Sequence, residues 1–72
     1  MFGQRVKKLR EQRGLTQQQL ADRAGLTNDT ISNYERGRRT DPPVSVVYAV
    51  ANALDVTVDD LLAPPEPEVA AR

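Results

Sequence analysis

Apolar side chains recur along this chain at the three- and four-residue spacing that gathers them on one face of an α-helix. The pattern is clearest in a helix whose apolar residues stand at i, i+3, i+4 and i+7: Val47, Val50, Ala51 and Leu54. Shorter runs of the same kind predict four further helices, around residues 2–9, 20–24, 31–34 and 61–62. No stretch alternates apolar and polar residues between turn residues, as a strand would. The sequence therefore predicts an all-α fold of five helices.

Threonines mark three of the helix starts. Thr16, Thr27 and Thr57 each stand where an N-cap is needed, because a Thr hydroxyl can accept a hydrogen bond from a free backbone N–H of the first turn. Apolar pairs five residues apart flank each cap in the hydrophobic-staple pattern: Leu15 with Leu20, Leu26 with Ile31, and Val56 with Leu61. Gln19, three residues after Thr16, adds a capping box.

The ends of the helices are marked as clearly as their starts. Gly14, Gly25 and Gly37 follow the first three helices, where a glycine commonly ends a helix in the left-handed conformation. Asp55 takes the same position after the fourth helix, and Asp tolerates the left-handed region better than most residues do. The fourth helix begins between residues 43 and 45, because two prolines before it favour an extended approach.

Residues 16–37 contain two short helices joined by a tight turn at residues 25–27. Ala21 is small where the two helices have to cross closely, and Gly25 can take the positive φ that the turn requires. The apolar residues that the two helices would share are Leu20, Ala24, Leu26, Ile31 and Tyr34. This spacing and these residue types predict a helix-turn-helix motif.

The segment LTQQQLADRAGLT at residues 15–27, followed by ISNYERG at 31–37, resembles the XRE family of helix-turn-helix proteins, the Cro and phage-repressor type. The resemblance extends over residues 2–62. It implies a five-helix bundle of the lambda-repressor-like DNA-binding type, with a central helix-turn-helix, that binds operator DNA, usually as a dimer. Three features depart from the family: Asp55 where Gly is usual, the acidic Asp29, and a slightly long connection at residues 38–43 with two prolines.

We expect residues 1–62 to form one DNA-binding domain, with the helix-turn-helix motif at residues 16–36. Residues 63–72 hold three prolines and show no periodicity, so we expect a disordered tail containing Pro and Glu. The simplest interpretation of this tail is a frayed end without a role of its own.

Charge is distributed unevenly although the net charge is zero. Residues 1–40 carry nine Lys and Arg against four Asp and Glu, a net charge of +5. Residues 41–72 carry one Arg against six acidic residues, a net charge of −5. This asymmetry favours a basic working face with an acidic back or tail, although ordinary solvated surface charge explains it equally well.

The second helix of such a motif, here residues 28–36, enters the major groove of DNA with its N-terminus first. Because Ile31 and Tyr34 have to face the core, we expect four short polar side chains to face outward as base-contacting candidates: Asn28, Asp29, Ser32 and Asn33. Asn can pair with adenine, and Asp can accept a hydrogen bond from cytosine N4. The alternative is a solvated helix face, on which Asp29 only repels phosphates or stabilises the first turn of its helix.

Phosphate-contacting candidates lie at both ends of the motif: Arg10, Thr16, Gln17, Arg36, Arg38 and Arg39. Gln17 stands in the first turn of its helix, where free N–H groups favour an anion, and the family resemblance implies that this Gln contacts the DNA backbone. The three arginines after the recognition helix could hold the flanking backbone, although they could also serve solubility alone. Thr16 is better suited to capping than to binding a phosphate.

Arg10 and Glu35 are paired by the family resemblance as an ion pair between the first helix and the end of the recognition helix. Its expected role is to orient the two helices, with Arg10 also leaning toward a phosphate. Removing one partner of such a pair would leave the other charge uncompensated.

The composition limits the possible functions. Cysteine and histidine are both absent, which excludes disulfides and cysteine metal sites and removes the commonest general base. With no phosphate-cradling glycine loop either, we expect neither an enzyme nor a cofactor or metal. No apolar run is long enough to span a membrane and no signal peptide is evident, so we expect a cytoplasmic protein of a bacterium or phage, associated with the nucleoid when bound.

Two functions remain. The first is a sequence-specific regulator of transcription that binds double-stranded DNA, most simply a repressor that binds a palindromic operator as a homodimer. The alternative is an antitoxin or other protein-binding module, with a small protein partner, that also binds its own operator. The acidic residues between 55 and 68 and the Pro-rich tail are the features that favour the alternative.

Overall fold

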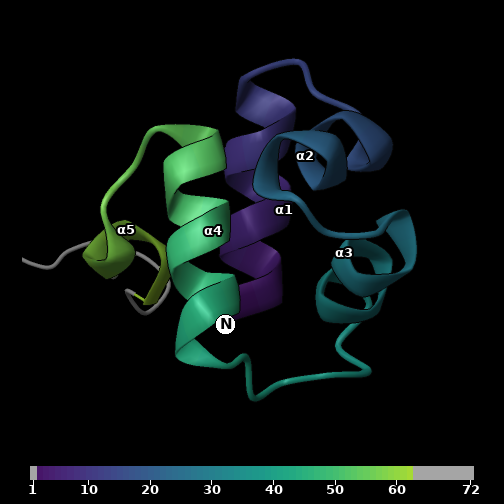
Figure 1. The fold of residues 1–72 in the computed structure, drawn as a ribbon, viewed down its shortest axis with the longest axis vertical. Helices are drawn as coiled ribbons and strands as arrows, with labels where there is room; N and C mark the ends of the chain where they lie inside the picture. Colours follow the sequence, from purple (N-terminus) through teal and green to yellow (C-terminus); the bar gives the residue numbers. More distant parts are fainter. Residues whose placement is uncertain (1, 63–72) are drawn as a thin grey trace, which may run out of the picture.

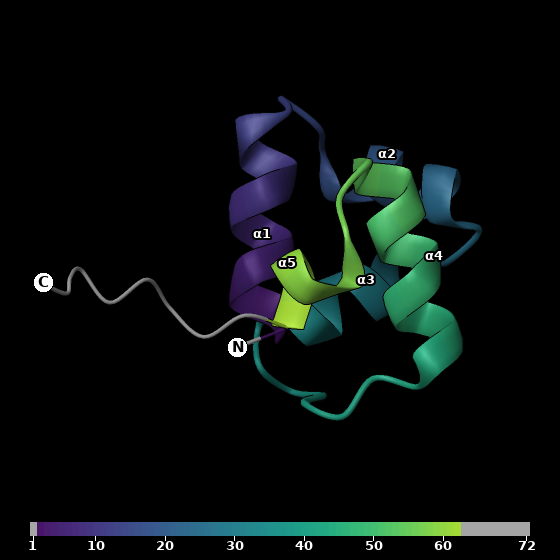
Figure 2. The ribbon, with the colours of Figure 1, turned by 90° about the vertical axis from the view of Figure 1, so that its left-hand side faces the viewer.

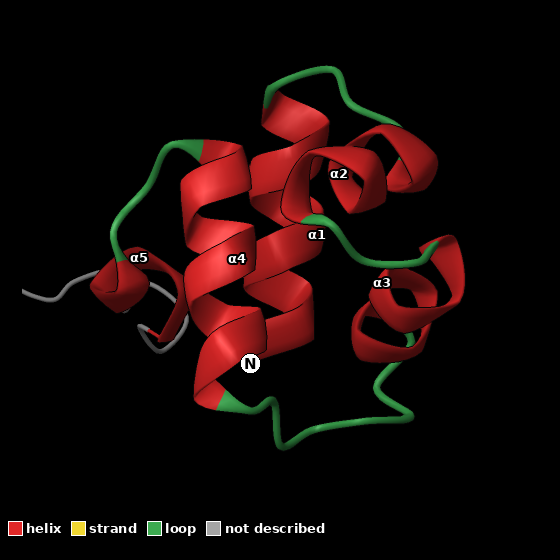
Figure 3. Cartoon of the chain, in the orientation of Figure 1, coloured by secondary structure: helices red, strands yellow, loops and turns green. Residues whose placement is uncertain are grey.

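The computed structural model describes residues 2–62, which form five α-helices joined by loops (Figures 1 and 3). In chain order they are α1 (Phe2–Gln12), α2 (Gln17–Ala24), α3 (Asn28–Glu35), α4 (Val44–Leu54) and α5 (Val58–Leu62). No strand occurs within this part of the chain, and the prediction of an all-α, five-helix fold is confirmed. The tail predicted for residues 63–72 lies outside the described residues.

The helices divide into two sides. α5 packs against both α1 and α4 and lies between them in Figure 2, while α2 and α3 pack against each other behind this group. α1 also contacts α3, and α4 contacts α2, so the helix-turn-helix pair rests on both long helices. Within residues 2–62, this arrangement covers the inner face of α3 and places no helix on its outer face.

One apolar core connects all five helices. Its completely buried side chains come from four of the helices: Val6, Leu20, Ala21, Val50, Leu54 and Leu61. α3 adds Ile31, which is only 1% exposed. Burying an aliphatic side chain of this size contributes roughly 1.5–3 kcal/mol, so this core is the main source of stability. Ala21 has no exposed surface, in agreement with a close crossing of α2 and α3 at this residue.

All three threonine caps are confirmed. The Thr16 hydroxyl accepts from the Gln19 N–H at 3.0 Å, and the Gln19 side chain accepts from the Thr16 N–H at 2.9 Å, which completes the predicted capping box. Thr27 accepts from the N–H of Thr30 at 3.1 Å. Thr57 and Asp60 bond reciprocally in the same way, with distances of 3.1 and 3.2 Å, and form a second capping box.

Four helices end at a residue in the left-handed conformation, at the positions that the sequence predicts: Gly14, Gly25, Gly37 and Asp55. At Gly25, with φ of 71°, the following N–H of Leu26 donates to the carbonyl of Ala21 at 2.8 Å and turns the chain toward α3. Asp55 has φ of 59° and is the only non-glycine residue with positive φ among residues 2–62.

Candidate nucleic-acid interface

α3 presents a narrow polar surface to solvent. Ile31 and Tyr34 are buried and fix the rotation of the helix, with 1% and 2% of their surfaces exposed. Asp29 is exposed, and Asn28 and Asn33 are half-buried. Three of the four predicted base-contacting residues therefore reach the outer side of α3.

Ser32 is the exception, because it is buried where the sequence predicts an exposed side chain. Only 8% of its surface is exposed. Ser32 stands about 100° from Ile31 and about 160° from Tyr34 around the helix, so the rotation of α3 alone does not bury it. Its short side chain is therefore covered by neighbouring groups.

The C-terminal end of α3 is tied to the loop that follows it. The N–H of Gly37 donates to the carbonyl of Tyr34 at 3.1 Å, and the N–H of Arg38 donates to the carbonyl of Asn33 at 2.9 Å. These two bonds form a Schellman motif. The N–H of Arg39 also approaches the Asn33 carbonyl, at 3.3 Å. The loop therefore holds the predicted arginines Arg36, Arg38 and Arg39 directly beside α3, and all three are exposed.

Glu35 gathers three side-chain donors at the same end of α3. Its carboxylate accepts from Arg10 Nε at 2.8 Å, from Arg10 Nη2 at 3.0 Å and from Gln17 Nε2 at 3.0 Å. The Glu35 side chain is only 3% exposed, so the charged group is almost completely desolvated. The hydrogen bonds from one carboxylate thus join α1, α2 and α3.

Arg10 is directed into the protein. Besides its bonds to Glu35, its Nη1 donates to the Leu15 carbonyl at 2.7 Å, and its side chain is 11% exposed. The hydrogen bond to Glu35 raises the pKa of the Arg10 guanidinium, against a smaller lowering by burial. Three of its five N–H groups thus bond within the protein, which favours an orienting role for Arg10 over a phosphate contact.

The link between Gln17 and Glu35 was missed by the sequence analysis. It joins residues 18 positions apart, and no spacing rule within one helix could have indicated it. The amide of Gln17 keeps a second N–H, and the residue lies in the first turn of α2, where backbone N–H groups are free. Thr16 is exposed beside it, but its hydroxyl is used as the cap of α2.

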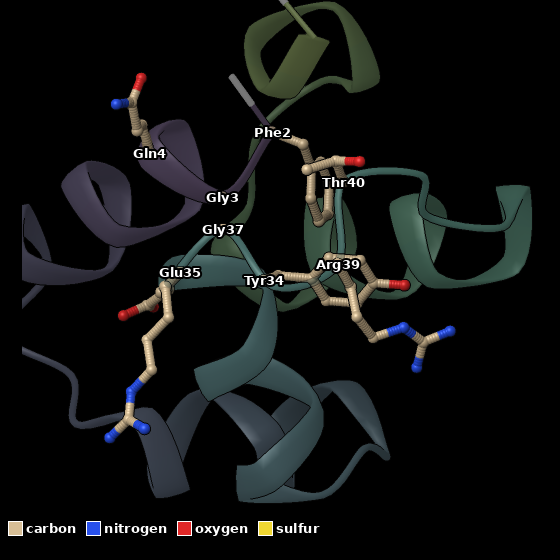
Figure 4. A pocket seen from close by; sticks show the side chains of 9 residues that line it. Phe2, Gly3, Gln4, Tyr34, Glu35, Gly37, Arg39 and Thr40 are labelled. Carbon is tan, nitrogen blue, oxygen red and sulfur yellow. The ribbon is translucent and has the colours of Figure 1, made fainter.

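Gly3 brings α1 into close contact with the end of α3. A Cβ atom at this position would overlap the carbonyl oxygen of Tyr34, so a side chain larger than that of glycine does not fit. A pocket of about 170 Å³ lies at this junction, between the start of α1 and the loop after α3. In Figure 4 the side chain of Gln4 points away from the close contact of Gly3 with the end of α3.

Comparison with known proteins identifies the class. A family model described as helix-turn-helix matches residues 6–61. The chain belongs to this family, the XRE type of helix-turn-helix proteins, as the resemblance in the sequence predicted.

Individual relatives agree with this assignment. The chain is 42% identical over 62 residues to the HTH-type transcriptional regulator YqaE of Bacillus subtilis, which covers 86% of this chain and 53% of YqaE. The crystal structure of SinR, the master regulator for biofilm formation, in complex with DNA matches with a TM-score of 0.83 and 37% identity, over 86% of this chain and 98% of that one. The restriction-modification controller protein C.AhdI of Aeromonas hydrophila matches with a TM-score of 0.79 and 37% identity, over 83% and 89% of the two chains.

The chain spans about half the length of the curated relatives it matches. Within residues 2–62 no helix has the length and apolar character needed to cross a membrane.

Proposed function

We propose that this chain is a sequence-specific DNA-binding regulator of transcription, acting as a repressor, and that α3 enters the major groove. The observation that carries the proposal is the outer side of α3. Short polar side chains with base-pairing chemistry stand there on a helix fixed by buried neighbours, and three exposed arginines follow at once. The fold is shared with the structure of SinR in complex with DNA, which supports DNA binding by this chain.

The residues divide between two tasks. Asn28, Asp29 and Asn33 contact base edges, with adenine suited to the asparagines and cytosine to Asp29. Phosphates are contacted by Gln17, Arg36, Arg38 and Arg39, which fix the position of the domain without reading the sequence. Arg10, Thr16 and Ser32 have no direct contact in this proposal, because the first two bond within the protein and Ser32 is buried.

A homodimer on a palindromic operator completes the proposal. Two copies of α3 would then reach successive major grooves, about 34 Å apart. Such a protein acts in the cytoplasm of a bacterium or on a phage operator, where its DNA is accessible.

The test is selection of binding sites by the full chain from a random duplex library. We expect a palindromic sequence, in which Asn33→Ala relaxes one position per half-site and weakens binding by about 1–3 kcal/mol. Asn52→Ala is the matched control, because Asn52 is exposed on α4, away from α3. Absence of an enriched sequence, or equal effects of the two variants, would contradict the proposal.

A second function, binding of a small protein partner, is favoured by one observation. The SinR/SinI protein complex also matches this chain, with a TM-score of 0.87 and 32% identity over 99% of this chain and 69% of that one. We propose on this basis that the chain could serve as the DNA-binding half of a regulator and partner pair, such as an antitoxin with its toxin. Co-purification of a stoichiometric small protein from the native cell tests it, and a chain that purifies alone speaks against it.

A further inference from the structure

A buried aromatic ring lies directly beside an exposed cation at the end of α3. Tyr34 is 2% exposed, and its ring meets the edge of Phe2 with centroids 5.2 Å apart and an angle of 81° between the planes. The guanidinium carbon of Arg39 lies 5.3 Å from the centroid of the Tyr34 ring. This is within the distance at which a cation is attracted to the face of an aromatic ring. Figure 4 shows Arg39 extending past the ring toward solvent.

The side chain of Arg39 is held more firmly than those of the other two arginines of the loop. The backbone N–H groups of all three are hydrogen-bonded and do not distinguish them, but the Arg39 guanidinium also rests against the Tyr34 ring. Within residues 2–62, the side chains of Arg36 and Arg38 have no hydrogen-bond or ion-pair partner. The three residues carry the same charge, but only Arg39 is oriented before a ligand arrives.

We propose that Tyr34 is a positioning residue for DNA binding, which holds Arg39 in place as the fixed phosphate contact of the interface. The inference rests on the proposed function. A side chain that is ordered in the free protein loses less conformational entropy when it binds. Arg39 should therefore contribute more to affinity than Arg38, although both neutralise one phosphate charge.

The ring, and not the hydroxyl, carries this role. The Tyr34 hydroxyl is buried, and no group within residues 2–62 bonds to it. Tyr34→Phe should therefore keep Arg39 in place, because it retains the aromatic face. Tyr34→Leu still fills most of the core position but removes that face.

The test is a double-mutant cycle on the full chain, with duplex affinity measured at fixed salt. We expect Arg39→Ala to weaken binding by about tenfold in the unsubstituted protein but by only about threefold in a Tyr34→Leu background. In a Tyr34→Phe background the loss should again be about tenfold. Arg38→Ala is the matched control, with the same loss in every background. An Arg39→Ala effect that is unchanged by Tyr34→Leu would overturn the proposal.

A measurement without DNA separates this proposal from the proposed function. In NMR spectra of the free protein, the side-chain protons of Arg39, but not of Arg38, should be shifted upfield by the Tyr34 ring, and Tyr34→Phe should retain that shift. A missing shift overturns the positioning role even if DNA is bound. A normal shift with no binding to any duplex overturns the proposed function, and the positioning role with it. If Tyr34→Leu does not fold, the affinities of Arg39→Ala and Arg38→Ala, each made in the unsubstituted protein, are compared instead. Equal losses of affinity would overturn the proposal.

Discussion

The two ends of α3 are built differently. At the C-terminal end, Glu35 is buried among donors from α1 and α2, and the next residues fold back onto the helix. At the N-terminal end, Thr27 caps the helix through bonds to Thr30 alone, and Asp29 stands in solvent. One end is anchored to the rest of the domain, whereas the other is free to approach a ligand. The difference indicates that the C-terminal end contributes most to stability, whereas the N-terminal end is left open for base contacts.

Replacing Arg10 should give the largest effect, because it breaks the anchored end. Arg10→Met would leave the Glu35 carboxylate buried without its cation, and we expect a loss of about 3–5 kcal/mol in the free energy of unfolding. Urea denaturation measures the loss. Arg39→Ala, which removes an exposed arginine from the same end of α3, is the control and should cost about 1 kcal/mol or less. Equal losses in the two variants would contradict the view that burial separates these arginines.

The double substitution Arg10→Met with Glu35→Leu refines this prediction. Because it removes both charges together, it should recover much of the stability lost in Arg10→Met. It also removes the acceptor of Gln17, so DNA affinity should stay reduced even where stability returns.

Gly3→Ala should act on the same end with a smaller effect. The added Cβ overlaps the Tyr34 carbonyl, so α1 has to move away from α3, at a cost of about 1–3 kcal/mol. Thermal unfolding followed by circular dichroism tests this expectation. Gln4→Ala is the control, since Gln4 is the exposed neighbour in the same helix turn and its replacement should be nearly neutral. An unchanged thermal midpoint in Gly3→Ala would contradict the close contact between α1 and α3.

The salt dependence of DNA binding shows which arginines meet phosphates. If Arg36, Arg38 and Arg39 do so in both subunits of a dimer, the plot of log K against log salt should have a slope of about −5. Arg39→Ala should make that slope shallower by about 2, since two contacts are lost per dimer. Asn52→Ala should leave it unchanged. A slope near zero would speak against the proposed function, and an unchanged slope in Arg39→Ala would remove Arg39 from the interface.

Asp29→Asn should have the smallest effect on stability, because it changes only the free end. Loss of a negative charge from the first turn of α3 should cost about 0.3–1 kcal/mol. Affinity for random duplexes should rise, since a carboxylate no longer faces the phosphates, and a preference for cytosine at one position should weaken. If stability falls while both DNA measurements stay the same, Asp29 is only a charge at the helix start.

The boundaries of the helices could be predicted almost completely from the sequence. Each depends on atoms within five residues of one another, such as the Thr16 hydroxyl with the Gln19 N–H, or the Leu26 N–H with the Ala21 carbonyl. Such contacts depend on residue types at fixed spacing along the chain, so they can be predicted from the sequence. For the same reason Asp55 could be placed in the left-handed position after α4 without knowledge of the fold.

The candidate site could be predicted only in part. The need to bury Ile31 and Tyr34 supplied the outward position of Asn28 and Asn33, and the resemblance to a family supplied the pair of Arg10 and Glu35. It could not supply the burial of Ser32, which depends on how closely neighbouring helices pack over one short side chain. It also predicted only a contact of Gln17 with the DNA backbone, whereas in the structure the Gln17 side chain donates a hydrogen bond to Glu35.

The sequence by itself therefore determined the five helices, their caps and the helix-turn-helix, because these follow from local hydrogen bonding and from the period of the apolar residues. Only the tertiary structure decided which polar side chains are committed within the protein and which remain available. Arg10 and Arg39 are the same residue type beside the same end of α3, yet Arg10 meets a buried carboxylate, whereas Arg39 rests against a buried ring and stays exposed to solvent. The packing of helices that are far apart in the chain sets this difference. It determines which group lies beside each charged side chain and how much of that side chain water can reach.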